Sequence, residues 1–143
     1  MSALSGDGLA ALRADLAALL PEGPRYFPDG VATDQTDEEL AAELIREAAL
    51  ARVRDEVPHA VAVEVDEIDD RGADRVVHAA LLVEHESQKG ILIGAGGARI
   101  RAIGTAAREA LARLWGLPVH LDLRVKVRKR WRRDERMLDR LGL

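Results

Sequence analysis

Hydrophobic positions in the first third of the chain recur with the period of an α-helix. Leucines at this spacing predict an amphipathic helix over residues 9–20. A second helix is predicted to begin at Thr36, whose side chain can form a capping box with Glu39, and to run to about Val57. Residues 21–30 between the two helices are rich in proline and glycine, which indicates a connector and a candidate domain boundary.

After the second helix, the spacing of hydrophobic residues changes from the helical period to a period of two residues. Alternating apolar residues over 61–65 and 77–83, separated by a turn at 69–72, predict a β-hairpin. Residues 119–127 alternate strictly between aliphatic and polar side chains and form the clearest strand pattern in the chain. The sequence therefore predicts three strands, two of which belong to one hairpin.

Helical spacing returns between these strands and near the end of the chain. Residues 90–97 predict a short apolar helical turn that leads into a glycine cluster, and 98–115 predict a long helix that Gly116 closes as a left-handed cap. A last short helix is predicted over 133–141. This order of elements is typical of an α+β fold, in which a three-stranded sheet carries helices on one face and exposes the other face to water.

Composition narrows the chemistry that the chain can perform. The 143 residues are 48% hydrophobic and 3% aromatic, so we expect an aliphatic core. The absence of cysteine excludes disulfides and thiolate metal sites, and the four histidines have no neighbours at ligand spacing, so we expect no metal site. No serine stands in a nucleophile-elbow sequence, and we therefore predict no catalytic residue in this chain.

Charge is distributed unevenly along the chain. The formal net charge of −4 combines 7 basic and 20 acidic residues over 1–86 with 14 basic and 5 acidic residues over 87–143. Such an asymmetry indicates that the basic part meets an anionic partner, such as nucleic acid or a membrane surface. The sequence shows no apolar run long enough to span a bilayer and no secretory signal before the first helix, so we expect a cytoplasmic protein.

The glycine cluster within residues 90–104 has three competing interpretations. A dinucleotide-binding fingerprint counted from Gly94 would need a glycine where Arg99 stands. A phosphate-binding P-loop would end in Gly-Lys-Ser or Gly-Lys-Thr, which the sequence does not contain. The third interpretation is a G-x-x-G loop, Gly94–Gly97, between two helices, which is how K homology (KH) domains hold single-stranded nucleic acid.

A G-x-x-G loop suits this role for physical reasons. Glycines permit the sharp turn and let a sugar-phosphate backbone approach closely, and the N-terminus of the following helix attracts phosphate. Flanking cations can contact phosphates, flanking isoleucines can form an apolar floor for bases, and the basic run at the end of the last strand can add phosphate contacts. The candidate RNA-binding residues are Lys89, Ile91, Ile93, Gly94, Ala95, Gly96, Gly97, Arg99, Ile100, Arg101, Lys126 and Arg128.

Four segments of the sequence resemble the C-terminal KH domain of the bacterial Era family of GTPases. They are the run Ser87–Gly94 with the glycines that follow it, the strand Val119–Val127, the ending Trp131–Gly142 and the helix segment Leu44–Glu47. In addition, Ser2–Leu4 is similar to the last GTPase motif of that family, and the helix after it is similar to the final GTPase helix. The resemblance covers essentially the whole chain.

The resemblance implies two parts, a remnant of a GTPase domain with its linker over 1–30 and a type II KH domain over 31–143. The KH domain would bind the single-stranded 3′ end of small-subunit ribosomal RNA and act in assembly of the 30S subunit. Ser2, Ala3 and Leu4 would be a remnant of the nucleotide-binding site. The chain alone would need no cofactor, whereas the full-length family uses GTP and magnesium.

The resemblance also bears on partners. Those it implies are small-subunit ribosomal RNA, the 30S subunit and a GTPase domain of the full-length protein. It further implies a monomer, and it leaves peripheral contact with the inner membrane open.

The loop departs from the family at Ala95, where the family usually has lysine. One phosphate contact would be lost, and Lys89, Arg99 or Arg101 would have to replace it. The altered loop and the acidic first half of the chain keep a second hypothesis open. In that hypothesis the KH domain is a regulatory or docking domain, which contacts a GTPase domain or ribosomal proteins, and the glycine loop is structural.

Overall fold

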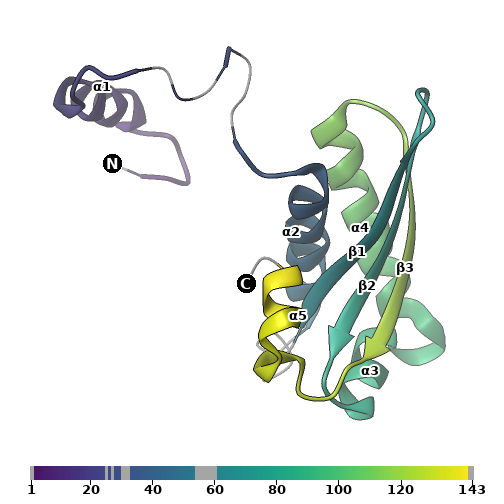
Figure 1. Cartoon of the computed structure of the whole chain (residues 1–143). Helices are drawn as coiled ribbons and strands as arrows, with labels where there is room; N and C mark the ends of the chain where they lie inside the picture. The colour runs from purple at the N-terminus through teal and green to yellow at the C-terminus, as the bar shows by residue number, and fades with distance from the viewer. Residues whose placement is uncertain (1, 25, 27, 30–32, 54–60, 142–143) are drawn as a thin grey trace. The chain divides into compact units, whose positions relative to one another are not determined.

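The chain folds into two compact units, Met1–Asp34 and Gln35–Leu143 (Figure 1). The first unit contains helix α1 (Leu9–Leu19), which the leucine spacing predicted, and none of the residues of α1 is buried. In the described part of the chain, no helix combines the length and the apolar character needed to cross a membrane. The computed structural model describes residues 2–24, 26, 28–29, 33–53 and 61–141.

The second unit confirms the predicted α+β fold with a mixed three-stranded sheet. The strands lie in the order β1-β2-β3; β1 is antiparallel to β2, and β3 is parallel to β2. The elements in chain order are α2 (Asp37–Leu50), β1 (Ala62–Asp70), β2 (Arg75–Val83), α3 (Glu86–Ile93), the 3-10 turn η2 (Ala95–Gly97), α4 (Ala98–Trp115), β3 (Val119–Val127), the 3-10 turn η3 (Trp131–Arg133) and α5 (Glu135–Arg140).

The main core lies between the sheet and helices α2, α3 and α4. Alternate residues of the central strand, from Val77 to Val83, point into this core, and α4 contributes one helical stripe. A β-bulge between Val65 and Glu67 shifts the alternation of β1, so that Ile68 packs against the same core as Val65. The core is aliphatic, as the composition predicted.

The opposite face of the sheet is only partly open to water. At one end, Ala80 and Leu82 form a second buried cluster with Trp131 and Met137. The prediction of a solvated face is therefore wrong at this end, because the chain crosses to that face after β3 and covers it with η3 and α5. Trp131 is 4% exposed and packs on the sheet within this cluster.

Helix α2 begins as predicted and ends earlier than predicted. Thr36 and Glu39 form the capping box, with the Thr36 N–H donating to Glu39 Oε2 over 2.8 Å and the Glu39 N–H donating to Thr36 Oγ1 over 3.2 Å. The helix stops at Leu50, because the backbone N–H of Arg52 donates to Ala49 O and the Arg52 side chain donates to Ala48 O. The predicted end at Val57 lies outside the described residues.

Other boundaries also differ from the sequence predictions. Strand β1 continues to Asp70, beyond the predicted start of the turn. Helix α3 begins at Glu86 rather than near residue 90, because the Gln88 side chain accepts the N–H groups of Glu84 and His85 and so fixes the start of the helix. The last helix begins at Glu135 rather than at residue 133, because Asp134 caps it by accepting the N–H of Met137.

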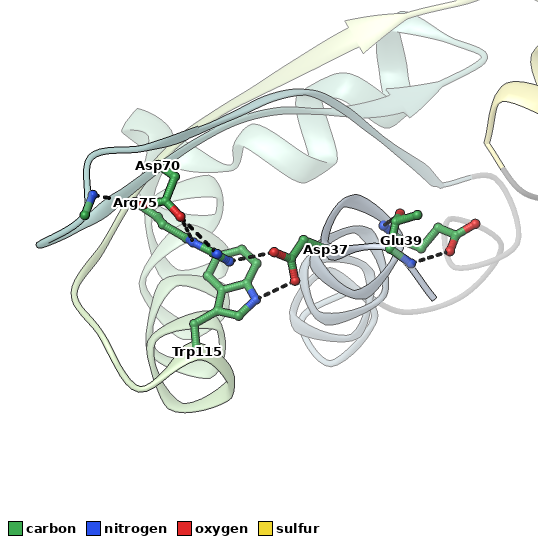
Figure 2. Close-up of polar contacts among 7 residues, drawn as sticks. Asp37, Glu39, Asp70, Arg75 and Trp115 are labelled. Atoms are coloured by element: carbon green, nitrogen blue, oxygen red, sulfur yellow. Dashed lines mark hydrogen bonds and ion pairs between the residues drawn. The ribbon is translucent and has the colours of Figure 1, made fainter. Parts of the chain in front are cut away.

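Arg75 joins three elements at the end of the sheet that carries the hairpin turn (Figure 2). Its guanidinium forms ion pairs with Asp37 at the start of α2, over 2.7 Å, and with Asp70 at the end of β1, over 3.1 Å. The same group lies 4.6 Å from the ring centre of Trp115, the last residue of α4, whose indole N–H donates to Asp37 over 3.1 Å. The cluster therefore holds α2, the hairpin and α4 in one arrangement.

Hydrogen bonds within this cluster also lower the pKa of Asp70. The Gly72 N–H donates to Asp70 Oδ1 over 2.9 Å, and the Arg75 side chain donates to Asp70 Oδ2. The Gly72 bond, followed by the Arg75 bond, holds the pKa of Asp70 below its ordinary value. Asp70 therefore keeps its charge, and its ion pair with Arg75, at a lower pH than an ordinary aspartate would.

We expect Arg75→Ala to lower the free energy of unfolding by about 1–3 kcal/mol. The substitution removes a partly buried guanidinium, its ion pairs with two carboxylates and its packing on Trp115. Arg71→Ala is the matched control: Arg71 is exposed at the turn and pairs only with Asp69 among the described residues, so its loss should leave stability nearly unchanged. Urea unfolding followed by circular dichroism measures both. Equal stability of the two variants would contradict a role for Arg75 in joining the elements.

Candidate nucleic-acid interface

The G-x-x-G loop, Gly94–Gly97, joins α3 to α4 through conformations that glycine favours. Gly94 has φ 71° and ψ 175°, Gly96 has φ 56° and Gly97 has φ 76°. The first of these conformations is accessible almost only to glycine. The Gly94 N–H closes α3 by donating to Gly90 O over 2.9 Å, and the Gly97 N–H donates to Gly94 O over 3.1 Å.

Gly94 also permits a close approach between the loop and α4. A Cβ atom on Gly94 would lie 2.8 Å from the Cβ of Arg99, which is too close for a side chain, and 3.1 Å from the Arg99 backbone nitrogen, which is a tight contact. Arg99 in turn reaches back to α3, where its guanidinium donates to the carbonyl oxygen of Ile91. The two helices are thus locked together on either side of the loop, and the loop is presented at the N-terminus of α4.

A groove begins next to the loop and runs between α4 and the edge strand β3. We call it the α4–β3 groove; its volume is about 430 Å³, and its lining residues are Ile100, Arg101, Gly104, Thr105, Arg108, Leu121, Asp122 and Leu123. Half-buried aliphatic side chains form its floor, and two exposed arginines of α4 stand at its rim. An apolar floor beside cations can accept the faces of bases and the phosphates that link them.

Asp122, the acidic residue of the groove lining, directs its carboxylate to the face of β3 opposite Leu121 and Leu123, where His78 lies. Asp122 accepts a hydrogen bond from Arg124 over 2.6 Å and lies 3.3 Å from Nδ1 of His78. The Arg124 bond, followed by the His78 contact, holds the pKa of Asp122 below its ordinary value. The carboxylate therefore lies away from the groove floor, and the other charged residues of the lining are Arg101 and Arg108 of α4.

The predicted residues on α3, in the loop and at the start of α4 lie around the same turn of the chain. They differ in how exposed they are and in whether they line the groove. Ile100 and Arg101 line the α4–β3 groove beside the loop. Ile91 is 41% exposed on α3, near the loop, and Ile93 and Lys89 on the same helix are half-buried.

Two predicted residues lie away from the groove floor. Lys126 lies on the face of β3 opposite Leu121 and Leu123. Its ammonium lies 3.2 Å from Asp66 and 3.6 Å from Glu64. Arg128 follows the end of β3, its side chain is exposed, and its N–H donates to Val83 O over 2.7 Å. RNA contacts of these two side chains stay predictions.

Several residues of the groove were not predicted from the sequence, although it contains signals for them. Gly104, Thr105 and Arg108 recur with Ile100 and Arg101 at spacings of three and four, which places them on one face of α4. Leu121 and Leu123 are the apolar positions of the predicted strand. Only the parallel pairing of β3 with β2, which the sequence did not reveal, puts these two sets next to each other.

The predicted nucleotide-binding remnant, Ser2–Leu4, lies in a turn of the first unit. The Ser2 N–H donates to Asp7 O over 2.9 Å, and the Gly6 N–H donates to Ser2 O over 3.0 Å. The sequence contains no P-loop motif.

The loop between two helices, the mixed sheet and the groove along an edge strand define a class of single-stranded nucleic-acid-binding module. A family model described as the KH domain matches residues 56–132. The chain belongs to the KH domain family. Within it, the chain matches the C-terminal half of Era-type GTPases.

The curated relatives include proteins named GTPase Era. Those of Mycobacterium tuberculosis (strain H37Ra) and Mycolicibacterium smegmatis are 58% and 54% identical over 99% of this chain. A solved structure of an Era variant from Aquifex aeolicus bound to GDP and AlF4− has a TM-score of 0.92 and 39% identity, covering 99% of this chain. A structure of Era in complex with MgGDPNP and nucleotides 1506–1542 of 16S ribosomal RNA has the same values.

The chain spans 48% of the length of these relatives and of these solved chains.

We expect Gly94→Ala to lower the free energy of unfolding by about 2–3 kcal/mol, because alanine is strained in this conformation and its Cβ meets Arg99. Gly90→Ala is the control: Gly90 lies within α3, and a Cβ there meets nothing within 4 Å, so it should be neutral or stabilising by up to about 1 kcal/mol. Chemical denaturation compares them. If both variants were as stable as the parent, the close approach at Gly94 would not constrain the fold.

Proposed function

We propose that this chain binds single-stranded RNA along the α4–β3 groove, with the G-x-x-G loop receiving the sugar-phosphate backbone. The main observation behind the proposal is the groove itself, which has an apolar floor and whose lining residues Ile100 and Arg101 lie next to Gly97 of the loop. Glycine positions without Cβ atoms let a phosphate come close to the loop, and the positive end of the α4 dipole favours it there.

Single strands suit this groove better than duplexes. Unstacked bases can lie on Ile100, Leu121 and Leu123, whereas paired bases in a helix present no free faces. Among the described strands β3 pairs only with β2, so its outer edge has backbone donors and acceptors that can bond the edges of bases. The floor thus supplies stacking surface, and the strand edge supplies hydrogen bonds.

The proposed RNA is the 3′ end of small-subunit ribosomal RNA. A solved Era protein of the same fold is in complex with nucleotides of 16S ribosomal RNA, and it is 39% identical to this chain. The basic second half of the chain, with 14 basic and 5 acidic residues over 87–143, is suited to such a partner. On this proposal the chain acts with the 30S subunit during its biogenesis.

The larger protein that this proposal implies is an Era-type GTPase. Relatives named GTPase Era are about twice as long as this chain, and solved Era structures hold GDP with AlF4− or MgGDPNP. GTP hydrolysis would belong to the part of that protein that this chain does not match. The division into a GTPase remnant over 1–30 and a KH domain over 31–143 is part of the same proposal.

The cytoplasmic localisation, the monomeric state and the peripheral contact with the inner membrane stay predictions from the sequence.

To test RNA binding, Ala95 and Gly96 are both replaced by aspartate. Both positions are exposed, and a Cβ on Gly96 meets nothing within 4 Å. Two negative charges against the phosphates should weaken binding of a pyrimidine-rich oligonucleotide from the 3′ end of 16S ribosomal RNA by at least about tenfold. Fluorescence anisotropy measures the affinity.

The hairpin turn provides a chemically matched control. Gly72 and Ala73 are also an exposed glycine–alanine pair, and Gly72 has a similar backbone conformation, with φ 79°. The double variant Gly72→Asp, Ala73→Asp should bind RNA like the parent. If the loop variant also bound like the parent, the proposal would be wrong. If the parent showed no RNA binding even at low salt, the docking hypothesis would be favoured.

A further inference from the structure

The G-x-x-G loop of this chain carries no charge of its own. Its four residues are Gly94, Ala95, Gly96 and Gly97. Backbone N–H groups and a helix dipole attract phosphate, but a charge-assisted bond from a cation is roughly twice as strong as a neutral hydrogen bond. If the loop binds phosphate as proposed, the cation that serves it must come from a neighbouring position.

Two of the three neighbouring cations are poorly placed for this task. The guanidinium of Arg99 is held toward α3, because one of its N–H groups donates to the carbonyl of Ile91. Lys89 lies in the first half of α3 and is half-buried. Because Cβ atoms in a helix tilt toward its N-terminus, Lys89 is directed away from the loop, which follows the C-terminus of α3.

Arg101 is directed toward the loop by the same geometry. It is the fourth residue of α4, so its side chain leans back over the N-terminal turn of that helix. Its Nη1 atom lies 3.0 Å from the point where a Cβ of Gly97 would stand. A Cβ at residue 97 would therefore require the guanidinium to shift by a few tenths of an ångström.

Arg101 is also free to bind. It is exposed, and its guanidinium has no hydrogen-bond or ion-pair partner among the described residues. It lines the α4–β3 groove at the end that meets the loop. An unpaired, planar guanidinium at this point can bond a phosphate with two parallel N–H groups.

We propose that Arg101 supplies, from the first turns of α4, the positive charge that the G-x-x-G loop lacks. It contacts the phosphodiester that the loop receives, over Gly97, and so sets where the backbone of the RNA enters the groove. Gly97 serves the same contact, because it leaves room for the guanidinium. This inference rests on the proposed RNA binding at this site, and it assigns the phosphate contact at the loop to Arg101.

The first test compares Arg101→Ala with Arg113→Ala. Both arginines are exposed on α4, but Arg113 lines a different surface, between α2 and α4. With a single-stranded oligonucleotide from the 3′ end of 16S ribosomal RNA, Arg101→Ala should weaken binding about tenfold. It should also reduce the slope of log affinity against log salt by about 0.7, the value for one lost phosphate contact with a single strand. Arg113→Ala should match the parent in both measurements.

The second test moves the charge back into the loop. Ala95 is exposed and lies in the 3-10 turn, so lysine fits at this position. The double variant Ala95→Lys, Arg101→Ala should recover most of the lost affinity and the parental salt slope, because a cation again stands beside the same phosphate. Thermal unfolding of each variant, expected to match the parent, shows that the changes act on binding and not on folding.

The outcomes separate this inference from the proposed function. If the parent binds RNA and Arg101→Ala binds it equally well, Arg101 does not serve the loop, although the groove still binds RNA. If Arg101→Ala weakens binding but lysine at residue 95 restores nothing, the charge acts elsewhere and the assignment to the loop is wrong. If the parent does not bind RNA, the proposed function and this inference fail together.

Discussion

The close approach of Gly94 to Arg99 is the contact on which the candidate site depends. A side chain at residue 94 would lie 2.8 Å from the Cβ of Arg99, so only glycine lets the chain turn from α3 into α4 at this angle. Arg99 then secures the turn by bonding to Ile91 O. The direction of α4, the exposure of Ala95 and Gly96 and the position of the Arg101 side chain all follow from this one turn.

Helix α4 links the stability of the fold to the candidate site. One row of its side chains packs in the core, and the adjacent row lines the groove. Ile103, Ala107 and Leu111 are fully buried against the sheet, and the stripe beside them, from Ile100 to Arg108, lines the groove. Any movement of the core stripe would therefore move the groove. At the far end of α4, the contacts of Trp115 with Arg75 and Asp37 fix the helix against the hairpin and α2.

Much of the fold could be predicted from the sequence because its signals are local. Strict alternation predicted β3, the Thr36–Glu39 pair predicted the start of α2, and Gly116, with φ 68°, closes α4 as predicted. The groove could not be predicted, since it depends on β3 lying parallel to β2 at the edge of the sheet. The partners of individual cations could not be predicted either. Arg99 and Arg101 are close in sequence and were predicted to act together, but the structure shows that Arg99 bonds to Ile91 and Arg101 does not.

The most direct test of RNA binding in the α4–β3 groove is a titration of isotope-labelled protein with single-stranded RNA, followed by backbone amide NMR shifts. We expect the largest shifts at residues 94–101, at 104–108 and at 121–123, which form the loop and the groove. Amides of α2 and of the cluster around Trp131 and Met137 should change little. The largest shifts on the opposite face of the sheet, around Lys126, or in the basic segment 128–133, would contradict the account.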